Sequence, residues 1–75
     1  MLAITATRHD GTMVVLSVER MVMWYPFVLR DGDGKEVALL TRIVIDAGSA
    51  LIEIDVTETV EEIDTCMNNA VRYEG

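Results

Sequence analysis

Side chains that could carry out catalysis are scarce, since the 75-residue chain holds one histidine and one cysteine. Nucleophilic catalysis needs a base within hydrogen-bond reach of the nucleophile and a third group that orients the base. His9 beside Asp10 is a possible acid–base pair, but it stands next to a turn signal. Cys66 follows Ile63 by three residues within a helical pattern, where a cysteine packs as a small apolar side chain. We therefore predict no catalytic residues and a protein that is not an enzyme.

Metal ligands with a recognisable spacing are equally scarce. The segment from Asp31 to Glu36 resembles the start of a calcium loop, which requires an oxygen ligand fifth, a glycine sixth and a glutamate twelfth. Those three positions hold Lys35, Glu36 and Arg42, so we interpret the segment as a glycine-rich hairpin turn. We expect no metal and no cofactor, and a lone cysteine allows no disulfide within the chain.

An acidic run between residues 53 and 64 is the first candidate for recognition. It holds six carboxylates and no base: Glu53, Asp55, Glu58, Glu61, Glu62 and Asp64. It is either a solvated surface with negative charge at a helix N-terminus or a face that mimics nucleic-acid phosphates. The net charge is -7, from 13 acids and 6 bases. Because phosphate binding needs clustered lysine and arginine and these bases are scattered, we expect no direct nucleic-acid binding.

A second candidate surface is the apolar stretch Met21–Tyr25, which is rich in methionine and aromatic residues. Such residues fill ordinary cores and also form adaptable binding surfaces. The stretch is apolar on both faces of a strand, and a small domain rarely covers both by itself. We therefore favour a binding interface over an ordinary core for this stretch. The predicted interaction residues are Met21, Met23, Trp24 and Tyr25, with Glu58, Glu61 and Asp64 from the acidic run.

The elements that must position these residues follow from periodicity and turn signals. Two-residue alternation and β-branched residues predict strands at 2–7, 12–16, 20–25, 37–45 and 50–56, with a break at 17–20 and an end at Pro26. Asp-Gly pairs and the segment 46–49 mark the turns. We predict an α+β fold that is mostly β, with a small antiparallel sheet of four to five strands and one C-terminal helix, in a single domain spanning 1–75.

The C-terminal helix is predicted over residues 60–71. Thr59 and Glu62 have the spacing of a capping box, in which hydroxyl and carboxylate satisfy free amides at a helix start. The side chains expected to face the sheet recur at helical spacing: Val60, Ile63, Met67 and Val71. The strand at 37–45 is apolar on both faces, so it is either central and covered twice or buried in an oligomer.

The apolar content exceeds what so short a chain can bury. Hydrophobic residues make up 51% of the chain and the mean hydropathy is +0.29, whereas a domain of this size buries only about 60–65% of its unfolded surface. The longest apolar run is far below the ~18 residues of a spanning helix. We therefore expect a homo-oligomer and no membrane insertion. The N-terminus lacks the positive segment of a signal peptide, so we expect a cytoplasmic protein.

Both ends of the chain resemble one known family. Ile4-x-x-Thr7-x-x-x-Asp10-Gly11 before an apolar strand, and the segment from Gly48 to Ile63, are similar to the opening and close of the FlbD-like (SwrD-like) flagellar and swarming-motility proteins. The resemblance implies a small, β-rich, non-enzymatic protein with a C-terminal helix and no catalytic residues. Tyr25 to Val37 reads as an inserted hairpin region.

These observations together predict a regulatory module that acts through protein–protein contact, bacterial or phage in origin. Two alternatives remain open. One is an acidic phage-type inhibitor that occupies a basic site on a host protein; the other is an oligomeric module that binds a small ligand. Salt dependence separates mimicry from apolar contact, because only binding by charge weakens steeply as salt rises.

Overall fold

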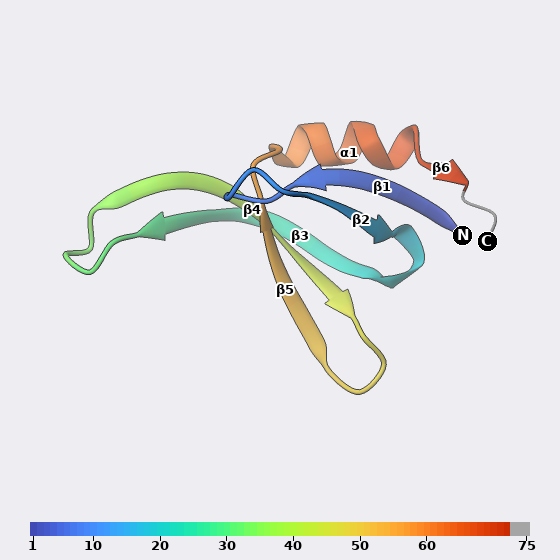
Figure 1. Cartoon of the computed structure of the whole chain (residues 1–75), viewed down its shortest axis with the longest axis horizontal. Coiled ribbons are helices and arrows are strands. Elements are labelled where there is room, and N and C mark those ends of the chain that lie inside the picture. Colours follow the sequence, from blue (N-terminus) through green and yellow to red (C-terminus); the bar gives the residue numbers. More distant parts are fainter. Residues whose placement is uncertain (73–75) are drawn as a thin grey trace.

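The computed structural model describes residues 1–72, which form two three-stranded antiparallel sheets and one helix (Figure 1). The elements are β1 (Leu2–Thr7), β2 (Met13–Ser17), a 3₁₀ turn (Val18–Arg20), β3 (Met21–Arg30), β4 (Glu36–Asp46), β5 (Leu51–Val56), α1 (Val60–Asn68) and β6 (Val71–Arg72). The sheets have the strand orders β2-β1-β6 and β3-β4-β5. The predicted α+β class, mostly β with a helix near the C-terminus, is confirmed, although the strands divide between two sheets.

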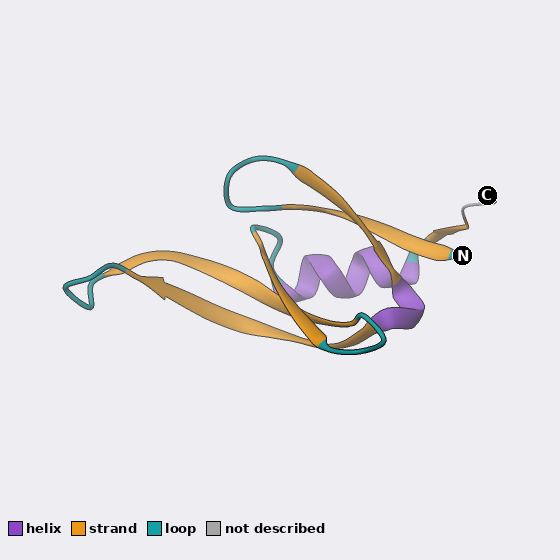
Figure 2. Cartoon of the chain, turned by 60° about the horizontal axis from the view of Figure 1, so that its bottom comes forward, coloured by secondary structure: helices purple, strands orange, loops and turns teal. Residues whose placement is uncertain are grey.

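The core lies between the two sheets and the helix. Its buried side chains are Ile4, Ala6, Leu16, Ile43, Val56 and Ile63. α1 lies alongside β1 and contacts β3 as well (Figures 1 and 2). A backbone hydrogen bond from Thr57 to the Thr7 carbonyl, 2.8 Å long, joins the end of β5 to the end of β1. The core therefore ties the helix to both sheets.

The predicted end of the second strand region at Pro26 is wrong. β3 runs through Pro26, which pairs with Thr41 of β4, and continues to Arg30. Proline lacks an N–H and is tolerated on the edge of a sheet, where that position faces away from the neighbouring strand. β3 is such an edge strand, since β4 is the one strand that pairs with it among residues 1–72. The predicted break at 17–20 is confirmed, as a 3₁₀ turn.

The predicted helix is also too long. α1 ends at Asn68, and Asn69 closes it by donating its N–H to carbonyls of the last turn. Val71 pairs instead with Ala3 as part of β6, and its side chain is exposed. A two-residue connection, Asn69 and Ala70, thus returns the chain to the edge of β1 that β2 leaves open. This backbone pairing outweighs the helical spacing of Val71.

The first predicted turn forms at Asp10-Gly11. Gly11 has φ +91°, a backbone region that a side chain disfavours. The Asp10 carboxylate accepts hydrogen bonds from the Thr12 hydroxyl at 2.6 Å and the Thr12 N–H at 2.9 Å. The bond from the hydroxyl is the main reason that the pKa of Asp10 lies below its ordinary value. This turn fixes the register of β1 against β2.

Beyond the last residue of β5, the β3–β4 hairpin continues as an extension that we call the arm, residues 27–40. β5 pairs with β4 over Thr41–Asp46, so the arm is two-stranded and leaves the body of the molecule (Figure 1). The radius of gyration is 13.0 Å, against about 11 Å for a compact chain of this length. The surface area is 5074 Å², against about 4,600 Å² for a compact protein of this mass. The hairpin turn expected within Tyr25–Val37 forms at the tip of this arm, and the arm extends past Val37 to residue 40.

The capping box at the start of α1 is present as predicted. The Thr59 hydroxyl accepts from the Glu62 N–H at 3.1 Å, and the Glu62 carboxylate accepts from the Thr59 N–H at 3.2 Å. We expect Thr59→Ala to lower the free energy of unfolding by about 0.5–2 kcal/mol, because one helix amide loses its acceptor. Urea unfolding followed by circular dichroism measures this. Thr57→Ala, an exposed threonine outside the box, is the control, and an equal loss there would contradict the capping role.

Candidate interaction surfaces

The four residues of the predicted apolar interface divide between the two faces of β3. Met21 and Trp24 are half-buried and pack against the core. Met23 and Tyr25 lie on the opposite face, with 52% and 38% of their surface exposed. The cause is a register shift between Met21 and Met23, since an extra residue in a strand reverses the alternation of side chains. The apolar candidate surface is thereby narrowed to Met23 and Tyr25.

Met23 and Tyr25 belong to a surface that we call the outer face: Met23, Tyr25, Phe27, Arg42, Glu53 and Asp55. Cross-strand pairing aligns Tyr25, Arg42 and Asp55 in one row, and Met23, Val44 and Glu53 in the next. Because neighbouring antiparallel strands place paired side chains on the same side of a sheet, these residues share the face opposite the core. The arrangement of these side chains in rows follows from the pairing register of β3, β4 and β5.

Arg42 stands at the centre of the outer face and contacts three of its members. Its Nε donates to Asp55 Oδ1 at 2.8 Å and its Nη2 to Asp55 Oδ2 at 3.1 Å, while Nη1 lies 2.9 Å from Glu53 Oε2. The guanidinium also lies over the Phe27 ring, 3.6 Å from the centroid. The hydrogen bond to Asp55 raises the pKa of the Arg42 guanidinium. One cation thus pairs with two carboxylates and offsets half of their charge.

The outer face therefore combines an apolar surface with a small net charge of -1. Its charged groups are one arginine and two carboxylates, whereas the whole chain carries -7. Methionine, tyrosine and arginine are enriched in protein interfaces. Sequence reasoning missed Arg42, although the alternating Glu53 and Asp55 were a signal that one strand face is acidic. The residue that balances them is set by strand register.

The predicted acidic residues do not form one uniform surface. Glu58 Oε1 accepts the Thr7 N–H at 2.7 Å, and Asp64 Oδ1 accepts from Trp24 Nε1 at 2.9 Å. Glu62 is part of the capping box. The Glu61 carboxylate is exposed, and residues 1–72 supply it with no hydrogen bond or ion pair. Much of the acidic run therefore holds the fold together, and Glu61 is the carboxylate left open to solvent.

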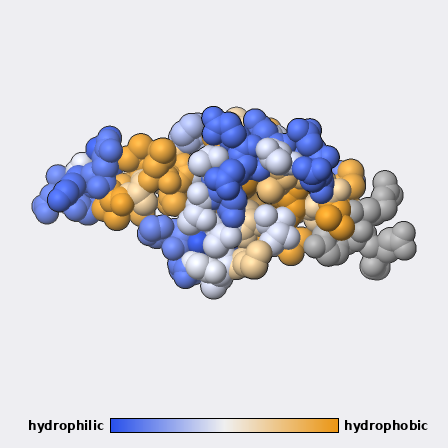
Figure 3. All heavy atoms as spheres, turned by 90° about the horizontal axis from the view of Figure 1, so that it is seen from above, coloured by the Kyte–Doolittle hydropathy of each residue, from blue (hydrophilic) through white to orange (hydrophobic). Residues whose placement is uncertain are grey.

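A groove lies where the arm meets the start of α1, and we call it the arm-base groove. It has a volume of about 260 Å³ and is lined by Pro26, Leu39, Leu40, Thr41 and residues 57–61. The Thr41 hydroxyl donates to the Glu58 carbonyl at 2.6 Å and fixes the two sides relative to each other. Leu39 is 69% exposed. Figure 3 shows apolar atoms on the arm between its hydrophilic tip and a hydrophilic surface over the body.

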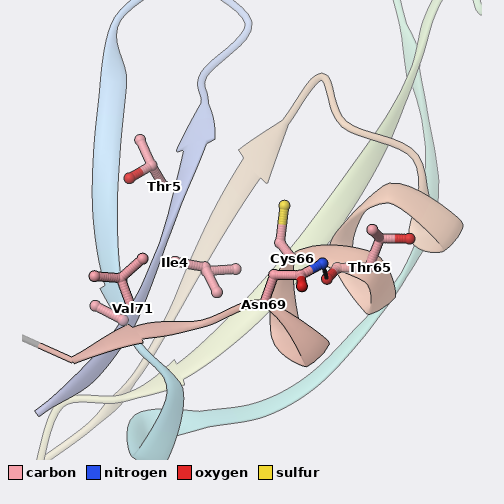
Figure 4. Close-up of a pocket in the computed structure, with 7 residues that line it drawn as sticks. Ile4, Thr5, Thr65, Cys66, Asn69 and Val71 are labelled. Atoms are coloured by element: carbon pink, nitrogen blue, oxygen red, sulfur yellow. Dashed lines mark hydrogen bonds between the residues drawn. The ribbon is translucent and has the colours of Figure 1, made fainter.

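A second groove, of about 270 Å³, lies between β1 and α1 (Figure 4). It is lined by Ala3, Ile4, Thr5, Thr65, Cys66, Asn69 and Val71. Cys66 is half-buried there, and the Asn69 amide donates to the Thr65 carbonyl at 3.0 Å. His9 is exposed in the β1–β2 turn and does not line this groove. Among the described residues that line this groove, none is an acid or base that could activate the thiol.

Residues 1–72 hold neither a cluster of candidate metal ligands nor a helix that could span a membrane. Nowhere in residues 1–72 do three or more histidine, cysteine or acidic side chains gather as a metal site would require. Within that range, no helix has both the length and the apolar character needed to cross a membrane. Comparison with family models, curated proteins and solved structures finds no match to this chain.

Proposed function

We propose that this protein is a non-enzymatic interaction and regulatory module that acts as a homo-oligomer and contacts another protein in the cytoplasm. The outer face is the observation that carries the proposal. It presents Met23, Tyr25 and Phe27 around an arginine whose charge is already matched. The resemblance of both chain ends to the FlbD-like proteins supports the same class of function.

Charge explains why copies would meet through this face and not elsewhere. Two chains of charge -7 repel each other, and the repulsion acts over about 10 Å at 0.1 M salt. The outer face bears a net charge of -1, because Arg42 offsets one of the two carboxylates, Glu53 and Asp55, that it contacts. Burying Met23 and Tyr25 there removes apolar surface from water without leaving a carboxylate unpaired. Self-association through the outer face therefore avoids most of the electrostatic cost.

Light scattering coupled to gel filtration tests this proposal. We expect a mass of at least two chains of 8.3 kDa at micromolar concentration. Met23→Lys should weaken self-association by about tenfold or more, since a charge would be buried without a partner. Met13→Lys makes the same change at an exposed methionine of β2 and should leave the mass unchanged.

Two results would contradict the proposal. A mass of one chain at every concentration would exclude self-association, and equal effects of Met23→Lys and Met13→Lys would remove the outer face as its site. Raising the salt concentration should strengthen or preserve the oligomer, because it screens the repulsion between copies. Dissociation by salt would indicate contact through opposite charges.

A further inference from the structure

We infer that the arm-base groove binds a partner-protein segment in which an apolar side chain stands beside a lysine or arginine. This inference rests on the proposed function as an interaction module, but it concerns a different surface from the outer face. It assigns the partner a chemistry, namely a cationic and amphipathic segment.

The size and lining of the groove suit peptide side chains. Pockets that bind small molecules usually span about 300–1,000 Å³, whereas this groove has about 260 Å³. Pro26, Leu39 and Leu40 line one side, and Val60 stands on the other. Leu39 is mostly exposed, so an incoming apolar side chain can cover it without displacing any part of the fold. The groove therefore offers apolar contact for one or two side chains.

The charged side chains that line the groove are both acidic. These two are Glu58 and Glu61, and none of the described residues that line the groove is a lysine, arginine or histidine. Glu58 already accepts the Thr7 N–H, while the Glu61 carboxylate is open to solvent. The free backbone N–H groups at the N-terminus of α1 attract anions weakly. The Glu62 carboxylate already accepts one of these N–H groups, that of Thr59, within the capping box. A cation next to Glu61 therefore complements the groove, and a nucleic acid or acidic peptide does not.

A second copy of this chain fits the groove poorly. The arm projects from the body of the molecule (Figure 1), and its tip carries Arg30 and Lys35 but also Asp31, Asp33 and Glu36. Arg30 is paired with Glu36 at 3.4 Å within the same arm. The tip is thus net negative and would meet Glu61 with like charge. The occupant with matching chemistry is a segment of another protein.

Titration of the full-length ¹⁵N-labelled protein with three synthetic octapeptides tests the inference by NMR. The peptides share the frame Gly-Ser-Leu-X-Leu-X-Ser-Gly, with lysine, glutamate or serine at both X positions. We expect the lysine peptide to shift amide resonances of residues 39–41 and 57–61. The glutamate peptide should leave them unmoved. The serine peptide should bind at least about twofold more weakly than the lysine peptide, as loss of a surface ion pair predicts.

Matched variants locate the binding. Glu61→Gln should weaken the lysine peptide about two- to fivefold, the range of an exposed ion pair, and Leu39→Ser about tenfold, as the loss of one buried leucine contact predicts. Glu19→Gln and Leu51→Ser make the same changes at exposed positions away from the groove. Both controls should bind within about twofold of the wild-type protein, since surface changes away from a contact alter the free energy little.

Several outcomes would overturn the inference. The first is no binding of the lysine peptide, and the second is equal binding of the glutamate peptide. The third is equal weakening of lysine-peptide binding by Glu19→Gln and Glu61→Gln, which would show that net charge alone attracts the peptide. The mass of each sample, measured by light scattering, shows whether a failure concerns the groove or the proposed self-association. A one-chain mass with groove binding overturns self-association alone, while an oligomer without groove binding overturns the groove alone.

Discussion

Replacing Ile63 with alanine is expected to lower the free energy of unfolding by about 2–5 kcal/mol, the range for deletion of a large buried aliphatic side chain. Ile63 is 0% exposed and is the fully buried residue of α1. It packs in the cluster that joins β1, β2, β4 and β5 to the helix. The loss combines removed apolar contact with a cavity that these strands cannot close.

Urea unfolding at one fixed protein concentration measures the effect, because the stability of an oligomer depends on concentration. Leu51→Ala is the control, since that side chain is largely exposed on β5, and it should cost less than about 0.5 kcal/mol. If Ile63→Ala and the wild-type protein unfold at the same urea concentration, α1 does not dock on the sheets through Ile63. The position of Glu61 beside the arm would then lose its support.

The second large effect is expected at Arg42. Arg42→Leu should lower the free energy of unfolding by about 1.5–3 kcal/mol, the range for hydrogen bonds to charged groups. The substitution removes the guanidinium that bonds both Glu53 and Asp55, whose carboxylates then face each other without a cation. It also removes the contact with the Phe27 ring. The Arg42 side chain is mostly buried, so solvent screens these interactions less than at an open surface.

A double-mutant cycle with Asp55→Asn isolates the pairwise part of this cost. We expect a coupling free energy of about 1–3 kcal/mol between Arg42 and Asp55, since the two side chains share two hydrogen bonds. Arg30→Leu is the matched control, because its ion pair with Glu36 is exposed at both partners and should contribute less than about 1 kcal/mol. Additive single effects at Arg42 and Asp55 would show that the pair does not stabilise the fold.

Local features of the chain were predictable because their causes lie within a few residues. The strand Leu2–Thr7, the Asp10-Gly11 turn and the capping box at Thr59 each depend on alternation, a turn residue or a short hydrogen bond. The acidic character of the strand face that holds Glu53 and Asp55 was also visible in the alternation. Such signals need no knowledge of which strands become neighbours.

The sequence by itself thus determined the mostly β class, the start of the helix and the residue types of both candidate surfaces. Tertiary structure alone decided how those residues combine. β3 became an edge strand that tolerates Pro26, and one register shift separated Met21 from Met23. Strand register also placed Arg42 between two carboxylates, and the free edge of β1 drew Val71 out of the helical pattern. These outcomes depend on pairing between segments far apart in the chain, which periodicity within one segment cannot specify.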